Sequence, residues 1–221
     1  MKTKSLLQQQ AYDFIKEKIL SGEFIPDTLY SETKLSAEAG ISRTPMREAL
    51  QCLSQDGYIT IVPSKGFQIR QLTDKDMIET IQVRCAIEGF CTSVISNSID
   101  TPKGKELIDC LEELLDKMRA YSKKAASSRD ALEEFISYDH AFHLKLVEYV
   151  GNSEFEQLYQ RLIYMIRLTS NTALSKDGRI EGTLKEHEEI FNALKDGKAH
   201  DAYNILIEHL LMPIKINEKS Q

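Results

Sequence analysis

One short stretch of this chain, residues 58–70, has the pattern of β-strands, and the other patterned segments have the period of amphipathic helices. Residues 58–62 and 67–70 are rich in β-branched and aromatic side chains, and a tight turn over residues 63–66 joins them. Three short helical patterns precede this hairpin, over residues 8–20, 31–39 and 44–56. Three helices and a hairpin within about 70 residues predict a winged helix-turn-helix domain.

The chain beyond residue 72 shows helical patterns alone. We expect helices over residues 73–97, 103–124, 129–150, from 153 to about 169, 183–197 and 198–213. Thr183 with Glu186 has the spacing of a capping box that opens the fifth of these, and Pro213 is expected to end the sixth. The predicted fold is therefore mainly α, with a winged helix-turn-helix domain at 1–72 and an all-α antiparallel helical bundle at 73–221.

Composition excludes several classes of protein. The 221 residues are 42% hydrophobic and 28% charged, which suits a soluble domain with a real core. No apolar run is long enough to cross a membrane or to form a secretory signal, and the four cysteines form no Cys-x-x-Cys pair. We therefore expect a cytoplasmic protein with no membrane partner.

The acidic charge belongs to the second part of the chain. The formal net charge is −6, and residues 1–72 contribute +1 while residues 73–221 contribute −7. The balance per domain matters for partners, so the acidic total permits a nucleic-acid-binding head at the N-terminus.

The predicted third helix has the features of a recognition helix. A helix that enters the major groove presents its N-terminal residues to base edges, and here these are Ser42, Arg43, Thr44 and Arg47. The two arginines are four residues apart on one face, and each guanidinium can make a bidentate contact to guanine. The hydroxyls of Ser42 and Thr44 suit a phosphate, and Lys65 lies in the wing.

Four potential metal ligands lie on the inward-facing stripes of three predicted helices. They are the side chains of Asp139, His143, His187 and His209. A single buried histidine is usually hydrogen-bonded to a neighbouring carbonyl. Four polar side chains in otherwise apolar stripes favour a shared divalent cation, because each unpaired buried polar group costs roughly 1–3 kcal/mol. Imidazole with one carboxylate suits zinc, nickel, cobalt or manganese better than magnesium or calcium. His140 points about 100° away from Asp139 and is expected at the surface or behind the ligands, and His200 in solvent.

Residues 8–70 resemble the DNA-binding domain of the GntR family of bacterial transcription regulators. The matching segments are Ile19-Leu-Ser-Gly-Glu-Phe-Ile-Pro26, Ser31-Glu-Thr-Lys-Leu35, Ser42-Arg-Thr-Pro-Met-Arg-Glu-Ala-Leu50, Leu53-Ser-Gln-Asp-Gly57 and Gly66 of the wing. The family usually has an arginine after the Ser-Glu pair, where this chain has Thr33. Any contact that this arginine makes to DNA is therefore missing here.

Residues 73–211 resemble the ligand-sensing FCD domain of the FadR branch of the same family. The matching segments are Arg84-Cys-Ala-Ile-Glu88, Asp139-His-Ala-Phe-His143, Gly151-Asn152, Glu186-His187-Glu188-Glu-Ile190 and Glu208-His209-Leu210. The resemblance implies that Asp139 and the three histidines bind the metal, that a small carboxylate effector completes its coordination, and that the protein is a homodimer on a palindromic operator.

Candidates for binding the effector are less sharply defined. Arg84 lies on an inward stripe and could clamp a carboxylate, or it could pair with Glu88 one turn later. Arg167 and Asn171, both on the fourth predicted helix of the bundle, are further candidates.

The leading hypothesis is an effector-responsive transcription regulator, typically a repressor, and not an enzyme. The rival is a metal-dependent hydrolase or lyase, because a His/Asp site with an open position can activate water. The recognition helix has no role in that rival. A third possibility gives the metal a purely structural role.

Overall fold

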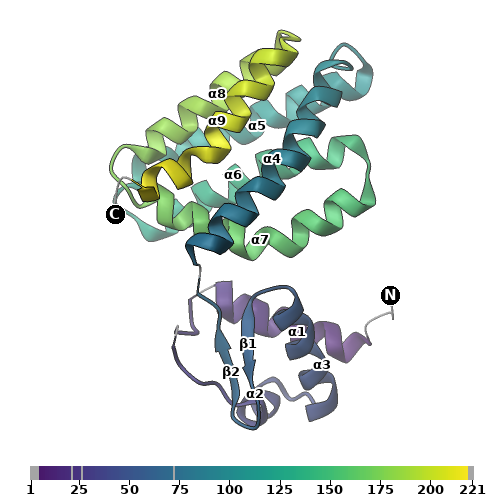
Figure 1. The fold of residues 1–221 in the computed structure, drawn as a ribbon, viewed down its shortest axis with the longest axis vertical. Helices are drawn as coiled ribbons and strands as arrows, with labels where there is room; N and C mark the ends of the chain where they lie inside the picture. Colours follow the sequence, from purple (N-terminus) through teal and green to yellow (C-terminus); the bar gives the residue numbers. More distant parts are fainter. Residues whose placement is uncertain (1–4, 21, 26, 72, 219–221) are drawn as a thin grey trace. The chain divides into compact units, whose positions relative to one another are not determined.

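The computed structural model describes residues 5–20, 22–25, 27–71 and 73–218. The chain divides into two compact units, Met1–Thr73 and Asp74–Gln221. The first unit contains three helices and a hairpin, and the described part of the second contains six helices (Figure 1). The predicted fold class is confirmed.

The helices of the first unit are α1 (Leu6–Leu20), α2 (Glu32–Ala39) and α3 (Arg43–Gln55). Ser31 caps α2 by accepting from the Lys34 N–H, and Gly40 ends this helix at a positive φ of 64°. The inward stripe of α3 was predicted correctly, because Met46, Ala49, Leu50 and Leu53 are all buried. This stripe packs α3 against α1 and leaves the opposite face of α3 in solvent.

The hairpin pairs β1 (Ile59–Val62) with β2 (Gly66–Ile69) in antiparallel register, with Ile59 opposite Ile69. Tyr30 joins the end of β2 through two backbone hydrogen bonds to Phe67 of 2.8 and 3.0 Å. Position 66 must be glycine, because its φ is 138° and a Cβ there would lie 2.0 Å from the Tyr30 carbonyl oxygen. This close approach fixes the wing beside the start of α2.

The second unit is a helical bundle. Its helices are α4 (Asp74–Ser96), α5 (Pro102–Ala125), α6 (Arg129–Val150), α7 (Ser153–Leu174), α8 (Arg179–Lys195) and α9 (Ala199–Glu218). The bounds predicted for α6 are confirmed, with Ser128 capping its start and Gly151 ending it in the left-handed region. A continuous apolar core joins α5, α6, α8 and α9, and α4 packs against α6, α7 and α9.

Two predicted helix ends were wrong. The helix α8 begins four residues before Thr183, after Gly178 at φ 72°, because the Glu186 carboxylate binds Arg179 and His209 instead of closing a capping box. The helix α9 continues through Pro213 to Glu218. A proline removes one helical N–H, so the helix loses the bond to the His209 carbonyl and otherwise continues.

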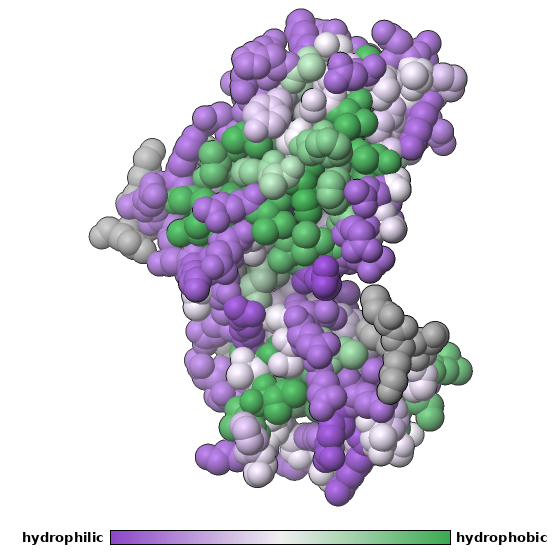
Figure 2. All heavy atoms as spheres, turned by 45° about the vertical axis from the view of Figure 1, so that its right-hand side comes forward, coloured by the Kyte–Doolittle hydropathy of each residue, from purple (hydrophilic) through white to green (hydrophobic). Residues whose placement is uncertain are grey.

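Hydrophobic side chains gather on one face of the second unit (Figure 2). Phe90 of α4 is 52% exposed and contacts Phe155 of α7 with ring centroids 5.7 Å apart. Val83, Leu158 and Leu162 of the same two helices are only partly buried. We call this surface the α4–α7 face. Among the described residues, no helix is both long and apolar enough to cross a membrane.

Candidate functional site

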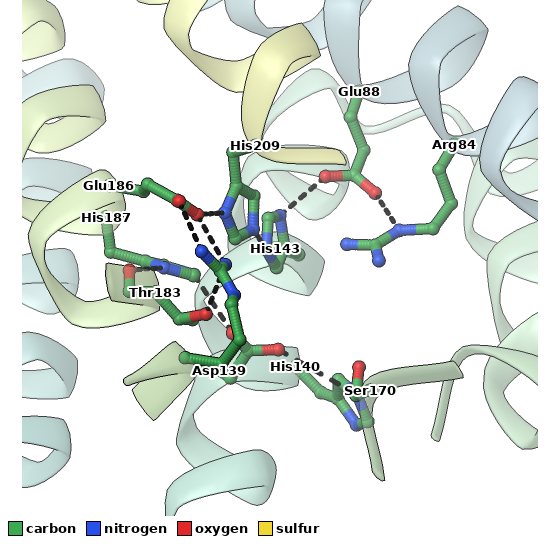
Figure 3. Close-up of polar contacts among 11 residues, drawn as sticks. Arg84, Glu88, Asp139, His140, His143, Ser170, Thr183, Glu186, His187 and His209 are labelled. Atoms are coloured by element: carbon green, nitrogen blue, oxygen red, sulfur yellow. Dashed lines mark hydrogen bonds and ion pairs between the residues drawn. The ribbon is translucent and has the colours of Figure 1, made fainter. Parts of the chain in front are cut away.

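The four predicted ligands meet in the interior of the second unit (Figure 3). Helix α6 carries Asp139 and His143 one turn apart, α8 carries His187 and α9 carries His209. One ligand atom from each residue lies within 4.8 Å of the others, and all four side chains are buried. The inward stripes of three helices therefore deliver one carboxylate and three imidazoles to a single point.

Each imidazole uses its Nδ1 atom for a hydrogen bond that faces away from this point. The Nδ1 of His143 lies 2.7 Å from Glu88 Oε2, that of His209 lies 2.7 Å from Glu186 Oε2, and that of His187 lies 2.8 Å from the Thr183 carbonyl. All three partners are acceptors, so each neutral ring carries its proton on Nδ1. The three Nε2 atoms are left with free lone pairs, which is the form that binds metals.

The distances between the Nε2 atoms and the Asp139 carboxylate suit shared coordination of a metal ion. His143 Nε2 and His209 Nε2 are 3.1 Å apart, and His187 Nε2 has no hydrogen-bond partner among the described residues although it lies 3.3 Å from Asp139 Oδ1. Adjacent ligands of one metal ion with bonds of about 2.0–2.1 Å lie roughly 3.0–3.4 Å apart. The donor set and these two distances therefore match those of a first-row divalent cation.

Burial keeps His143 and His187 neutral, and Asp139 stays ionised beside them. Burial lowers the pKa of His187 to about 4 and lowers the pKa of His143 well below its usual value. Burial alone would raise the pKa of Asp139, but the surrounding histidines lower it to about 2. Asp139, His143 and His187 are thus in their ligating protonation states at neutral pH.

A buried ion pair lies behind His143. The Nε of Arg84 donates to Glu88 Oε1 at 2.7 Å, and the other carboxylate oxygen accepts from His143. Burial raises the pKa of Glu88, and the adjacent Arg84 guanidinium opposes this shift. Arg84 was expected either to pair with Glu88 or to clamp a carboxylate effector. The pair with Glu88 is present, and the Nη2 atom of Arg84 keeps no hydrogen-bond partner among the described residues.

His140 is not at the surface. It is 5% exposed, and its Nε2 lies 3.0 Å from Ser170 Oγ. Burial lowers the pKa of His140 to about 4. The neighbouring turn of α7 covers this ring, so the surface alternative was wrong and the position behind Asp139 holds, with 3.9 Å between the two side chains. His200 is exposed, as predicted.

A second arginine supports the other two histidines. Arg179 makes two hydrogen bonds of 2.8 and 2.9 Å to the Glu186 carboxylate and a third of 2.8 Å to Thr183 Oγ1. Burial raises the pKa of Glu186, but Arg179 and His209 overcome this effect and lower it to about 2. The carboxylate that holds His209 therefore stays ionised.

A small cavity of about 30 Å³ adjoins the ligands. Its lining includes Arg84, Asp139, Arg179 and His209, together with Ser170 of α7. Arg167 and Asn171 are not among the lining residues, and Asn171 is exposed. A volume of this size has room for a water molecule or two.

The first unit carries a separate polar hollow of about 540 Å³ between α2, α3 and the wing. Arg43, Arg47 and Lys65 line it, and Thr33 lies on the same wall. Arg47 is held by a two-bond ion pair to Glu32, at 3.0 and 3.2 Å. Ser42 and Thr44 are exposed at the start of α3, where Ser42 occupies the cap position without a side-chain bond.

Five residues around these sites were missed in their observed roles. They are Glu32, Glu88, Arg179, Thr183 and Glu186. Arg179 was overlooked because it precedes the expected start of its helix. With the helix beginning at Arg179, residues 179, 183, 186 and 187 fall on one face, and this spacing was a readable signal.

Comparisons with known proteins agree with this division. Residues 79–211 match the FCD domain family, and residues 7–69 match the bacterial regulatory proteins of the gntR family. An uncharacterized HTH-type transcriptional regulator of Bacillus subtilis (strain 168), YdhC, is 30% identical over 203 residues, which are 90% of this chain and 86% of the relative. The HTH-type transcriptional repressor GlaR of Escherichia coli (strain K12) is 25% identical over 215 residues, covering 95% and 94%.

The fold is also shared with a solved structure. The structure of E. coli McbR/YncC has a TM-score of 0.73 at 20% identity and covers 98% of this chain and 99% of its own.

Proposed function

Because this chain belongs to the gntR family of bacterial regulatory proteins and carries an FCD domain, we propose that it is a metal-containing transcriptional repressor. Its family consists of transcription regulators rather than enzymes, so the hydrolase or lyase alternative is set aside. The first unit binds a double-stranded DNA operator, and the second binds a metal, an effector and a second copy of the chain. A regulator of this kind acts in the cytoplasm.

The convergence of three Nε2 lone pairs on one carboxylate is the observation that carries this proposal. Asp139, His143, His187 and His209 hold a divalent transition metal, with zinc the first candidate and nickel, cobalt or manganese the alternatives. Such an ion, when bound, ties α6, α8 and α9 to one point and offers open positions to an oxygen ligand. Glu88, Glu186 and Thr183 fix the three rings in the tautomer that ligation needs.

The charges around the cluster support an anionic effector. Three carboxylates and two guanidinium groups lie there, on Asp139, Glu88, Glu186, Arg84 and Arg179, for a net charge of −1. A divalent cation changes this to +1, which a small carboxylate neutralises. Arg84 Nη2 and Arg179 Nε are buried donors without a hydrogen-bond partner among the described residues, and both residues line the cavity beside the ligands.

The size of the cavity supports a response to that effector. At about 30 Å³ the space holds no organic acid, so binding requires the lining helices α4, α6, α7, α8 and α9 to separate. An effector that binds only the wider arrangement shifts the population toward it. Arg84 supplies the donor on α4 and Arg179 the donor on α8. Arg167 and Asn171 lie outside the present lining and remain candidates for contacting the effector once the helices have separated.

The polar hollow of the first unit supports DNA binding. Arg43 and Arg47 project from the exposed face of α3 and read base edges in the major groove, while Lys65 contacts a phosphate from the wing. Ser42 and Thr44 at the start of α3 bind the DNA backbone. Thr33 leaves this wall without the family's arginine, so base reading depends on the two arginines of α3.

The α4–α7 face supports a homodimer. An exposed apolar surface of this kind marks a site of protein association, and a palindromic operator needs two heads. Helix α4 carries both Phe90 of this face and the Arg84–Glu88 pair behind His143, so it connects the proposed interface to the metal ligands.

A thermal-shift and elemental analysis tests the proposal. Purified protein should contain one transition-metal ion per chain, and a panel of small mono-, di- and tricarboxylates should include at least one that raises Tm in the metal-loaded protein alone. A ligand at 100 times its Kd adds about 2.7 kcal/mol. Protein that takes up no metal, or that turns the acid over, contradicts the proposal.

A further inference from the structure

We infer that Arg179 is a positioning residue that holds two of the three histidines, His187 and His209, in their ligating orientation. This inference rests on the proposed metal site, because it concerns how the chain presents ligands to the ion. Arg179 is itself no ligand. It acts through Glu186 and Thr183, which share its face of α8. Figure 3 labels these two residues beside His209 and His187.

The first link runs from Arg179 to His209. The two guanidinium bonds of 2.8 and 2.9 Å hold both oxygens of Glu186, and Oε2 also accepts from His209 Nδ1 at 2.7 Å. A carboxylate has few rotamers that satisfy a bidentate fork and an imidazole together. Glu186 is therefore fixed by Arg179, and it fixes the ring of His209 across the gap between α8 and α9.

The second link runs from Arg179 to His187. Its Nη2 atom donates to Thr183 Oγ1 at 2.8 Å, and the carbonyl of the same threonine accepts from His187 Nδ1 at 2.8 Å. Residues 179, 183 and 187 lie on three successive turns of α8. The arginine thus clamps the first turns of the helix against which the His187 ring is oriented.

His143 belongs to a separate arrangement and serves as an internal reference. Its Nδ1 atom is held by Glu88, which pairs with Arg84 on α4, and none of these groups has a hydrogen bond or ion pair to Arg179 among the described residues. Loss of Arg179 should disturb the Nδ1 contacts of His187 and His209 and leave the Glu88 contact of His143 in place, although His143 Nε2 faces His209 Nε2 at 3.1 Å. A general loss of packing would disturb all three.

Arg119 of α5 provides a matched control, because it also pairs with a glutamate of α8. It pairs with Glu188 of α8 at 2.8 Å and with Asp116 of its own helix. Glu188 is next in sequence to the ligand His187 but lies outside the cluster. The change Arg119→Gln removes an arginine–glutamate pair to α8 without touching a residue that holds an imidazole.

The test measures Zn²⁺ affinity by competition with a chelator in the full-length protein. We expect Arg179→Gln to bind Zn²⁺ 10–100-fold more weakly than the unaltered chain, and Arg119→Gln to bind within twofold. Metal-free samples are compared by NMR of the histidine ring nitrogens, where Arg179→Gln should shift the Nδ1 signals of His187 and His209 and leave the Nδ1 signal of His143, which Glu88 holds. Arg179→Lys is the second variant in case the first does not fold, because an ammonium lacks the fork that reaches two partners. A smaller loss of affinity with the same NMR pattern is expected for it.

Two results overturn the inference. One is Zn²⁺ affinity equal to that of the unaltered chain in a folded Arg179 variant. The other is an equal disturbance of all three rings, since that shows a general structural role. Failure of the unaltered chain to bind Zn²⁺ instead contradicts the proposed function, and the NMR comparison of metal-free samples still decides the role of Arg179.

Discussion

The Nε2 atoms of His143 and His209 face each other at 3.1 Å, although both rings give their Nδ1 proton to a carboxylate. Two neutral imidazoles in this state present lone pairs to each other, which repel. A cation that binds both removes the repulsion. The distance between these two atoms is therefore the distance expected of two ligands of one metal ion.

Removal of a ligand should abolish metal binding. His187→Ala and His209→Ala are each expected to reduce metal content to near zero, and with it the increase in Tm that metal gives, because each removes one of the three imidazole ligands and releases its helix from the ion. Elemental analysis and thermal melts with and without a chelator measure both effects. His200→Ala is the matched control, since this histidine is exposed, and it should retain metal. His140→Ala should also retain metal, because the ring bonds to Ser170 and not to the cluster.

The stability of the metal-free protein should fall on mild acidification. Burial lowers the pKa of both His187 and His140 to about 4. Above the ordinary histidine pKa of about 6.5, neither the folded nor the unfolded state is protonated at these rings. Between this value and about 4, the unfolded chain takes up protons that the folded chain does not, so the free energy of unfolding decreases as the pH falls. The loss reaches up to about 3 kcal/mol per ring.

Urea unfolding in the presence of a chelator, at pH 7.0, 6.0 and 5.0, measures this loss. A free energy of unfolding that stays constant or rises over this range contradicts the assignment of neutral buried histidines.

DNA binding should depend on the arginines of α3 and on the wing in different ways. Arg43→Ala or Arg47→Ala should cost about 1–3 kcal/mol of binding free energy and relax the base preference at one position. Lys65→Ala should weaken binding to all sequences alike and reduce the slope of affinity against salt by about 0.9. Binding to the protein's own promoter region is measured at several salt concentrations. Unchanged affinity in the Arg43/Arg47 double variant excludes α3 as the reading helix.

Dimerisation should depend on the α4–α7 face. Phe90→Asp places a charge on an exposed aromatic position of this face and should convert the protein to a monomer at micromolar concentration. Leu29→Asp is the matched control, because Leu29 is 45% exposed in the first unit. Light scattering distinguishes the two outcomes. If Phe90→Asp remains a dimer, the interface lies elsewhere. If the unaltered chain is a monomer, the proposed homodimer is wrong.

The fold was predictable because amphipathic period and capping residues act locally. Met46 and Leu53 of α3 are buried as their spacing indicates, and Gly151 ends α6 as a left-handed cap. The four ligands were found by the same argument, since polar residues stand out on an apolar stripe. The start of α8 was not predictable in this way, because Glu186 has two long-range partners that compete with the local capping box.

The groups behind the ligands were harder to find for the same reason. Glu88 was read as a local partner of Arg84, and only the packing of α4 against α6 brings it to His143. Arg47 is a second example, because its ion pair with Glu32 depends on how α2 packs against α3. Sequence spacing identifies which residues share a helix face, whereas contacts between helices require the structure.

The most direct test of the central claim measures operator affinity in four states, with and without metal and with and without a carboxylate that stabilises the metal-loaded protein. We expect the carboxylate to change affinity for the protein's own promoter region typically 5–150-fold when metal is bound. We expect no change in metal-free protein or in the His187→Ala/His209→Ala double variant. A double variant without metal that still responds to the carboxylate as the unaltered chain does would contradict the account.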